Sequence, residues 1–147
     1  MYEKLNKVTI GGKKIPIKCD FAVLQIIQEE FGTLKNFEQK LIGIVPVLDK
    51  DGNQVYETKN GNETLKFKTT EPSLKAIALV LPIMINEGRK QMEEQGEEPT
   101  DFDYKKAIAE ADFSIIDVAL EIHNEYRRCF DRKKLTASKR TATKKSQ

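Results

Sequence analysis

The segment DKDGN at residues 49–53 resembles the beginning of a calcium-binding loop, because two carboxylates and an amide surround a glycine. An EF-hand loop needs oxygen ligands at positions 1, 3 and 5, glycine at position 6 and glutamate at position 12. With Gly52 at position 6, position 1 is Val47, which has no side-chain oxygen. With Asp49 at position 1, the glycine falls at position 4 and position 12 is Asn60. Both registers fail, so we interpret the segment as a turn and expect no metal site.

His123 is the only histidine, so any histidine base or zinc ligand has one candidate. On a helix, its partners one turn away would be Ala119 and Arg127, and neither can complete a ligand set. We therefore favour a partly buried structural histidine.

Cys19 and Cys129 lie far apart in the sequence, and neither belongs to a C-x-x-C pair. We expect buried or half-buried free thiols in a reducing compartment, with a disulfide as the less favoured alternative. Arg127 and Arg128 could lower the pKa of the Cys129 thiol, but its place on an apolar helix face favours a core residue.

No catalytic signature is present: the chain has no G-x-S-x-G, no P-loop and no G-x-G-x-x-G. Gly11 and Gly12 precede lysines but lack the spacing and the Ser or Thr of a phosphate loop. We expect a protein that is not an enzyme and binds no cofactor.

The charge is unevenly distributed. Of the 25 Lys and Arg residues, seven fall within residues 132–147, a segment that contains no Asp or Glu. The remaining 18 basic residues are outnumbered by 23 Asp and Glu residues, so residues 1–131 carry a net charge of −5. This tail could contact phosphates or an acidic protein, or it could be a solvated end. It has no aromatic side chain for base stacking, so we do not expect sequence-specific nucleic-acid binding. The candidate partner-binding residues of the tail are Lys133, Lys134, Lys139, Arg140, Lys144 and Lys145.

Hydrophobic periodicity and turn residues predict a mainly α fold of the α+β kind, in one domain over residues 1–131. The predicted elements are a β-hairpin at 8–19, helices at 20–31, 33–44, 71–94, 102–111 and 114–130, a β-hairpin insertion at 45–70, and a disordered basic tail at 132–147.

Local signals support these boundaries. Asp20 and Thr33 stand where helix N-caps belong, and Ser114 begins a capping-box pattern. The segment TTEP at 69–72 predicts the start of the central helix, which is apolar on every side from residue 74 to 85 and should be buried all round. Pro82 should kink this helix or divide it.

The longest nearly apolar run, residues 76–85, is too short to cross a membrane, and residues 1–10 contain no apolar run of signal-peptide length. We expect an intracellular protein without a membrane association.

Three segments carry a resemblance to a known family: IPIKCDFAVLQIIQEEFG at 15–32, EPSLKAIALVLPIMINEG at 71–88 and ALEIHNEYRRCF at 119–130. In this order, they resemble the tail assembly chaperones of long-tailed, siphovirus-type phages and prophages of Gram-positive bacteria. The similarity extends over most of residues 5–130 and includes no catalytic signature.

This resemblance implies a protein of the host bacterial cytoplasm that holds the tape measure protein soluble, helps to recruit tail tube subunits and is absent from the mature virion. In that family, a longer product is often made by ribosomal frameshifting near the end of the short reading frame, and the codons of Lys144 and Lys145 are the candidates for such a site. Self-association is left open. The alternatives are a small nucleic-acid-associated protein that acts through its basic tail, and a minor structural component of the tail.

Overall fold

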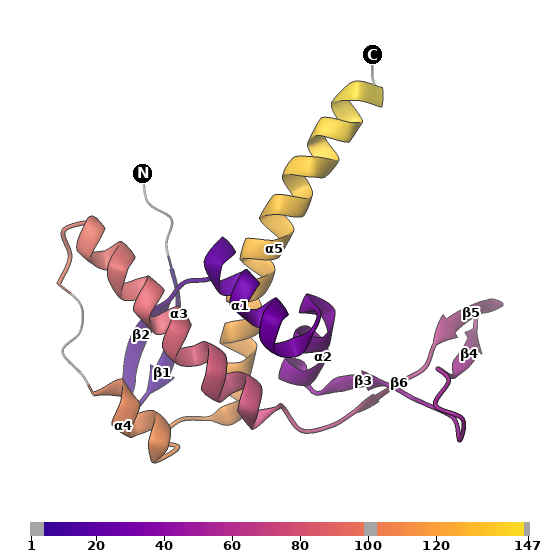
Figure 1. Ribbon diagram of the computed structural model, residues 1–147, viewed down its shortest axis with the longest axis horizontal. Coiled ribbons are helices and arrows are strands. Elements are labelled where there is room, and N and C mark those ends of the chain that lie inside the picture. Colours follow the sequence, from indigo (N-terminus) through magenta and orange to yellow (C-terminus); the bar gives the residue numbers. More distant parts are fainter. Residues whose placement is uncertain (1–4, 99–102, 146–147) are drawn as a thin grey trace.

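The computed structural model describes residues 5–98 and 103–145, with side chains as far as residue 131. It is mainly helical with small β-hairpins, which confirms the predicted fold class (Figure 1). The helices are α1 (Phe21–Phe31), α2 (Leu34–Ile42), α3 (Leu74–Glu94), α4 (Tyr104–Ala109) and α5 (Ile115–Lys145). The strands are β1 (Asn6–Ile10), β2 (Lys13–Ile17), β3 (Ile44–Pro46), β4 (Tyr56–Lys59), β5 (Asn62–Leu65) and β6 (Phe67–Thr69).

The N-terminal hairpin forms around the predicted turn, but its strands span residues 6–17 and not 8–19. Gly11 and Gly12 have φ angles of 57° and 74°, which a two-residue turn of type I′ requires and which glycine adopts without strain. The turn pairs Ile10 with Lys13 and Lys7 with Pro16. One face of the hairpin is apolar and buried, and it carries Val8, Ile10, Ile15 and Ile17.

Both predicted caps of the first two helices are present. The side chain of Asp20 accepts a hydrogen bond from the Val23 amide, and that of Thr33 accepts one from the Asn36 amide. The predicted end of the second helix at residue 44 is wrong, because α2 ends at Ile42 and Gly43 adopts a left-handed conformation.

The start of the central helix is also corrected. α3 begins at Leu74 with Ser73 as its N-cap, and not at residues 69–72, because a residue before proline disfavours the helical conformation and Pro72 therefore keeps Glu71 out of the helix. The helix then continues without a break through Pro82.

α3 is buried on one face only, so the prediction of burial on every side is wrong. Ala76, Val80 and Met84 are buried, whereas Leu74 is 62% exposed. The main contacts of α3 are with β2, α1, α2 and α5, and Tyr104 of α4 donates a hydrogen bond to Asn86.

The hairpin lies directly against α3 at Gly88. A Cβ atom at this position would come within 2.5 Å of the Pro16 carbonyl oxygen, so only glycine allows the two backbones to approach so closely. The Lys18 amide donates to the Met84 carbonyl at 3.0 Å, which joins the end of β2 to the same helix.

The last two helices differ in length from the predictions. α4 begins after the Asp103 N-cap and is shorter than the predicted 102–111, of which residue 102 lies outside the described part. α5 continues past residue 130 to Lys145, where a disordered tail was predicted. Residues 115–145 contain neither glycine nor proline, so no helix-breaking residue stops α5 there.

Candidate functional site

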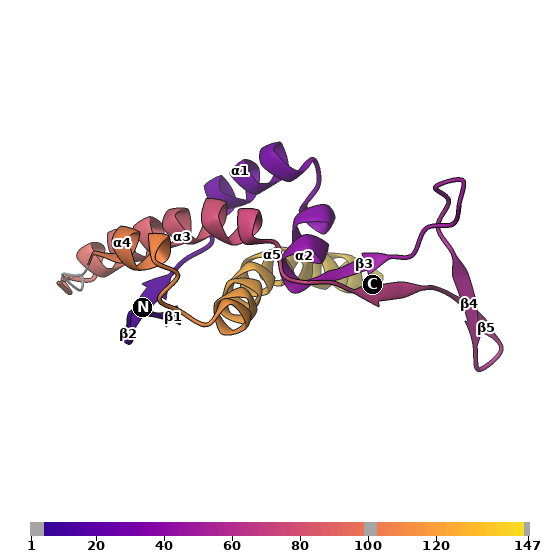
Figure 2. The same ribbon diagram turned by 90° about the horizontal axis from the view of Figure 1, so that it is seen from below.

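Residues 44–69 form an arm that extends from the helical body (Figures 1 and 2). We call this segment the ribbon arm. β3 pairs with β6 at its base, and β4 pairs with β5 at its tip. This arrangement confirms the predicted β-hairpin insertion.

Three backbone hydrogen bonds close a ring where the arm divides. The Val47 amide donates to Lys66, the Val55 amide donates to Val47, and the Lys66 amide donates to Val55, all at 2.9–3.0 Å. The ring joins the base of the arm, the loop of residues 48–54 and the β4–β5 hairpin. Backbone pairing therefore connects the three branches at this point.

The DKDGN segment is a turn within this arrangement. One oxygen of the Asp49 carboxylate accepts hydrogen bonds from the amides of Asp51 and Asn53, both at 2.9 Å. Leu48 and Gln54 pair across the turn. The Asp49 carboxylate thus serves the local backbone, as an Asx turn requires.

Apolar side chains are exposed along the ribbon arm. Leu48 is 58%, Tyr56 57% and Phe67 45% exposed. Together with Ile44, they make up four of the eight large exposed apolar residues in the described part of the chain. Ile44 lies at the base of the arm near α2 and is 38% exposed, so apolar surface is accessible along the length of the arm.

A buried carboxylate joins the N-terminal hairpin and the start of α1 to α5. Glu125 on α5 is completely buried and accepts hydrogen bonds from the Cys19 amide at 2.7 Å and from Asn6 at 3.0 Å. Arg128 donates to both of its oxygens and also to the Cys19 carbonyl. The hydrogen bond with Glu125 raises the pKa of Arg128. This cluster is saturated by internal partners, so its role is to hold β1, the start of α1 and α5 together.

Cys19 and Cys129 are both buried and free, which confirms their prediction as free thiols. They lie next to each other although the sequence separates them widely. A hydrogen bond between their side chains raises the pKa of the Cys19 thiol, and burial raises it further. A neutral, buried thiol is a poor nucleophile, so this pair belongs to the core.

His123 is partly buried, as predicted, and connects α5 to α2. Its Nε2 atom lies 2.9 Å from a Glu38 oxygen, and Arg127 lies 3.5 Å from the same oxygen. Within the described residues, no three His, Cys, Asp or Glu side chains gather closely enough to hold a metal ion.

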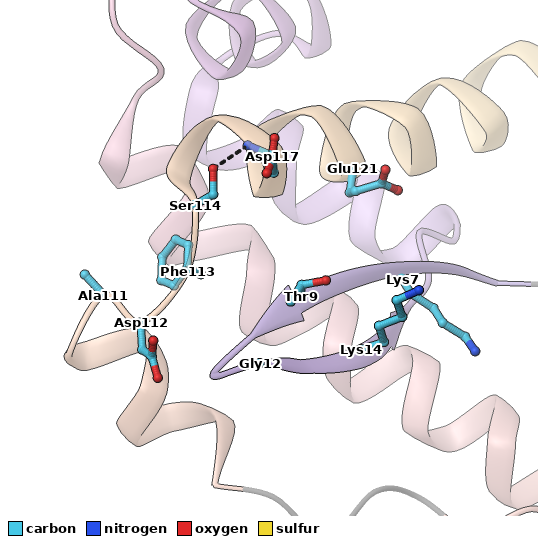
Figure 3. Close-up of a pocket in the computed structure, with 10 residues that line it drawn as sticks. All are labelled: Lys7, Thr9, Gly12, Lys14, Ala111, Asp112, Phe113, Ser114, Asp117 and Glu121. Atoms are coloured by element: carbon cyan, nitrogen blue, oxygen red, sulfur yellow. Dashed lines mark hydrogen bonds between the residues drawn. The ribbon is translucent and has the colours of Figure 1, made fainter.

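A polar cleft of about 890 Å³ separates the N-terminal hairpin from the loop between α4 and α5 (Figure 3). Lys7 and Lys14 line it from the hairpin, and Asp117 and Glu121 line it from the first two turns of α5. The remaining lining residues are Thr9, Gly12, Ala111, Asp112, Phe113 and Ser114.

The predicted basic residues of the tail cannot be placed in either surface. The side chains of Lys133, Lys134, Lys139, Arg140, Lys144 and Lys145 lie outside the described residues. Their prediction as a partner-binding group stays a prediction.

Sequence reasoning missed the Glu125 cluster and the cleft. One signal could have found the first: Glu125 lies one turn from Ile122 and Cys129 on the apolar face of its helix, where an acid must have partners. The sequence held no comparable signal for the cleft, because the cleft depends on how the hairpin sits beside α5.

Comparisons with protein-family models, with curated proteins and with solved structures found no match. In the part of the chain that the structure describes, none of the helices combines the length and the apolar character that crossing a membrane would require.

Proposed function

We propose that the chain is a non-enzymatic tail assembly chaperone of a long-tailed phage or prophage. In the host bacterial cytoplasm, it would bind the tape measure protein and help to recruit tail tube subunits. The resemblance of residues 15–32, 71–88 and 119–130 to this family supports the phage assignment. The ribbon arm supports the protein-binding role.

The ribbon arm is the main structural support for the proposal, because its exposed apolar side chains are unfavourable in a chain without a partner. An isolated two-stranded ribbon is marginally stable at best in water, and exposed apolar side chains gain nothing from solvent. Tyr56 on β4 and Phe67 on β6 are both about half exposed. A partner protein that covers them would recover their burial energy, and apolar surface of this kind marks interaction sites.

Assembly chaperoning fits this surface better than catalysis does. A chaperone needs accessible apolar and backbone groups for segments of its client, whereas an enzyme needs converging polar groups that are positioned around a reacting atom. The saturated Glu125 cluster provides no such group, since Cys19, Asn6 and Arg128 already occupy its oxygens.

Co-expression with the tape measure protein encoded beside this chain tests the proposal. We expect the tape measure protein to be soluble only when this chain is present. A tape measure protein that is equally soluble alone would overturn the proposed function.

The role of the arm is tested by the double variant Tyr56→Ser with Phe67→Ser. The matched control is Phe21→Ser with Leu74→Ser, since both of these apolar residues are 62% exposed but lie on the helical body. We expect the arm variant to lose the solubilising effect and the body variant to keep it. Equal effects of the two variants would exclude the arm as the client surface.

A further inference from the structure

The two edges of the N-terminal hairpin are covered unequally. Because the two-residue turn closes on the pair Ile10 and Lys13, alternate residues along each strand direct their amide and carbonyl groups away from the partner strand. On β2, Lys14, Pro16 and Lys18 do so. Pro16 has no amide hydrogen that could remain unpaired. α3 covers this edge through the close contact of Gly88 with Pro16 and the hydrogen bond from the Lys18 amide to the Met84 carbonyl.

On β1, the outward groups belong to Lys7 and Thr9. No hydrogen bond joins their outward amides and carbonyls to any residue that the structure describes. The edge ends at Gly11, whose amide donates to the Asp112 carbonyl at 2.7 Å. β1 therefore presents two donors and two acceptors in a row, at the spacing that an added strand would need.

This free edge borders the cleft, in which the α5 side is acidic and the hairpin side is basic. Figure 3 shows Asp117 and Glu121 on α5 along one side and Lys7 and Lys14 on the hairpin along the other. A volume of about 890 Å³ is near the upper end of the range for ligand pockets. The polar groups line an edge and do not converge on one point, which suits an extended chain better than a compact small molecule.

We propose that the free edge of β1 accepts an extended segment of a partner protein as a third strand of the hairpin sheet. Successive side chains of a strand point to opposite faces. The segment that fits therefore has a Lys or Arg directed at Asp117 and Glu121, followed by an acidic residue on the face of Lys7. Backbone pairing supplies the affinity, and the two charged walls select the segment. This inference concerns a different surface from the ribbon arm and does not depend on the proposed function.

Amide exchange with a defined probe tests the proposal directly. The probe is the blocked peptide Ac-TVKETVT-NH2. The control is the same peptide methylated on the backbone nitrogens of Lys and Glu, which keeps both charges but removes a central donor from each edge and hinders close approach of a strand there. We expect saturating peptide to slow exchange of the Lys7 and Thr9 amides at least tenfold. The Val8 amide is paired within the hairpin and should change little. If the Lys7 and Thr9 amides exchange unchanged, or if the methylated peptide protects them equally, the proposal is wrong.

Substitutions separate backbone pairing from charge. Thr9→Pro removes one outward donor at a position that makes no hydrogen bond to β2. Pro16 already occupies an equivalent outward position on β2, so the hairpin should still form. We expect Thr9→Pro to abolish peptide binding and Thr9→Val to retain it. Glu121→Lys should weaken binding of the probe about two- to fivefold, the range of an exposed ion pair. Undiminished binding by Thr9→Pro would overturn the proposal.

A second copy of the chain is the competing occupant. If protection of the Lys7 and Thr9 amides rises with protein concentration when no peptide is present, the edge pairs with another copy, and the proposal of a heterologous partner is overturned. Exchange that is independent of protein concentration, together with protection by the peptide, supports it.

Discussion

Replacing Glu125 with glutamine changes one buried atom and tests whether this carboxylate holds the domain together. Each carboxylate oxygen accepts two hydrogen bonds: Oε1 from Asn6 and Arg128, and Oε2 from the Cys19 amide and Arg128. In either orientation, a glutamine amide would place its NH2 group against two donors. The variant therefore loses a charge and gains two donor–donor contacts at nearly the same volume.

The magnitude follows from burial. Removing one partner of a buried ion pair costs about 3–5 kcal/mol. The Arg128 side chain is 27% exposed, so water still solvates part of its charge and the lower end of this range applies. We expect the free energy of unfolding to fall by about 3 kcal/mol, a large share of the ~5–15 kcal/mol of a typical domain.

Urea titration followed by circular dichroism at 222 nm measures the change in the free energy of unfolding. An unaltered slope of this free energy against urea concentration shows that both proteins expose the same surface on unfolding. Glu121→Gln is the matched control, because it is the same substitution one turn earlier on α5 at a residue that the solvent reaches. We expect less than about 0.5 kcal/mol for the control. A loss below about 1 kcal/mol for Glu125→Gln would refute the role of this cluster.

Three further predictions concern packing, pH and the turn. Gly88→Ala should destabilise the domain by about 2 kcal/mol in the same titration, because its Cβ meets the Pro16 carbonyl; unchanged stability would contradict that contact. Burial raises the pKa of Tyr126 to about 12. The unfolded chain loses this proton near pH 10 and the folded chain does not, so stability falls as the pH rises from 10 to 12, and Tyr126→Phe should weaken that fall in melting curves at pH 9 and 11.5. Asp49→Ala should speed amide exchange of Asp51 and Asn53 while the midpoint of global unfolding stays constant; an equal loss of global stability would show that the turn is not a local unit.

The features that the sequence predicted correctly depend on neighbouring residues. Asp20 and Thr33 cap their helices through amides three residues away, and Gly11 and Gly12 close a turn between adjacent strands. Such contacts join residues a few positions apart, so local pattern is sufficient to find them.

The features that it missed depend on distant residues. α2 was predicted to continue to residue 44, but the Gly43 carbonyl accepts a hydrogen bond from Thr70, and a β-carbon at Gly43 would overlap the backbone there. The apolar run of α3 indicated burial without indicating that neighbouring elements cover one face only. The turn of residues 49–53 was predicted correctly, but the pairing of β3 with β6 across the whole insertion was not evident from local pattern.

The same distinction applies to the candidate sites. The ribbon arm followed from turn residues, and its exposed apolar side chains could be named only once β4 and β5 were seen to stand away from the body. The cleft requires Lys7 and Glu121, which are far apart in the sequence, to face each other. No local sequence pattern indicates that two residues so far apart in the sequence line the same cleft.

The Glu125 cluster also sets an order in time for a chain that leaves the ribosome N-terminus first. The Cys19 carbonyl receives its hydrogen bond from Arg128, 109 positions later. At roughly 5–20 residues per second, translation needs about 5–20 s to supply that donor after Cys19 has been made. During this interval, the junction between β2 and α1 lacks its α5 partners. Native closure of the domain therefore waits until Glu125 and Arg128 have been made, because a nascent chain interrupted before them lacks the side chains that bind Asn6 and Cys19.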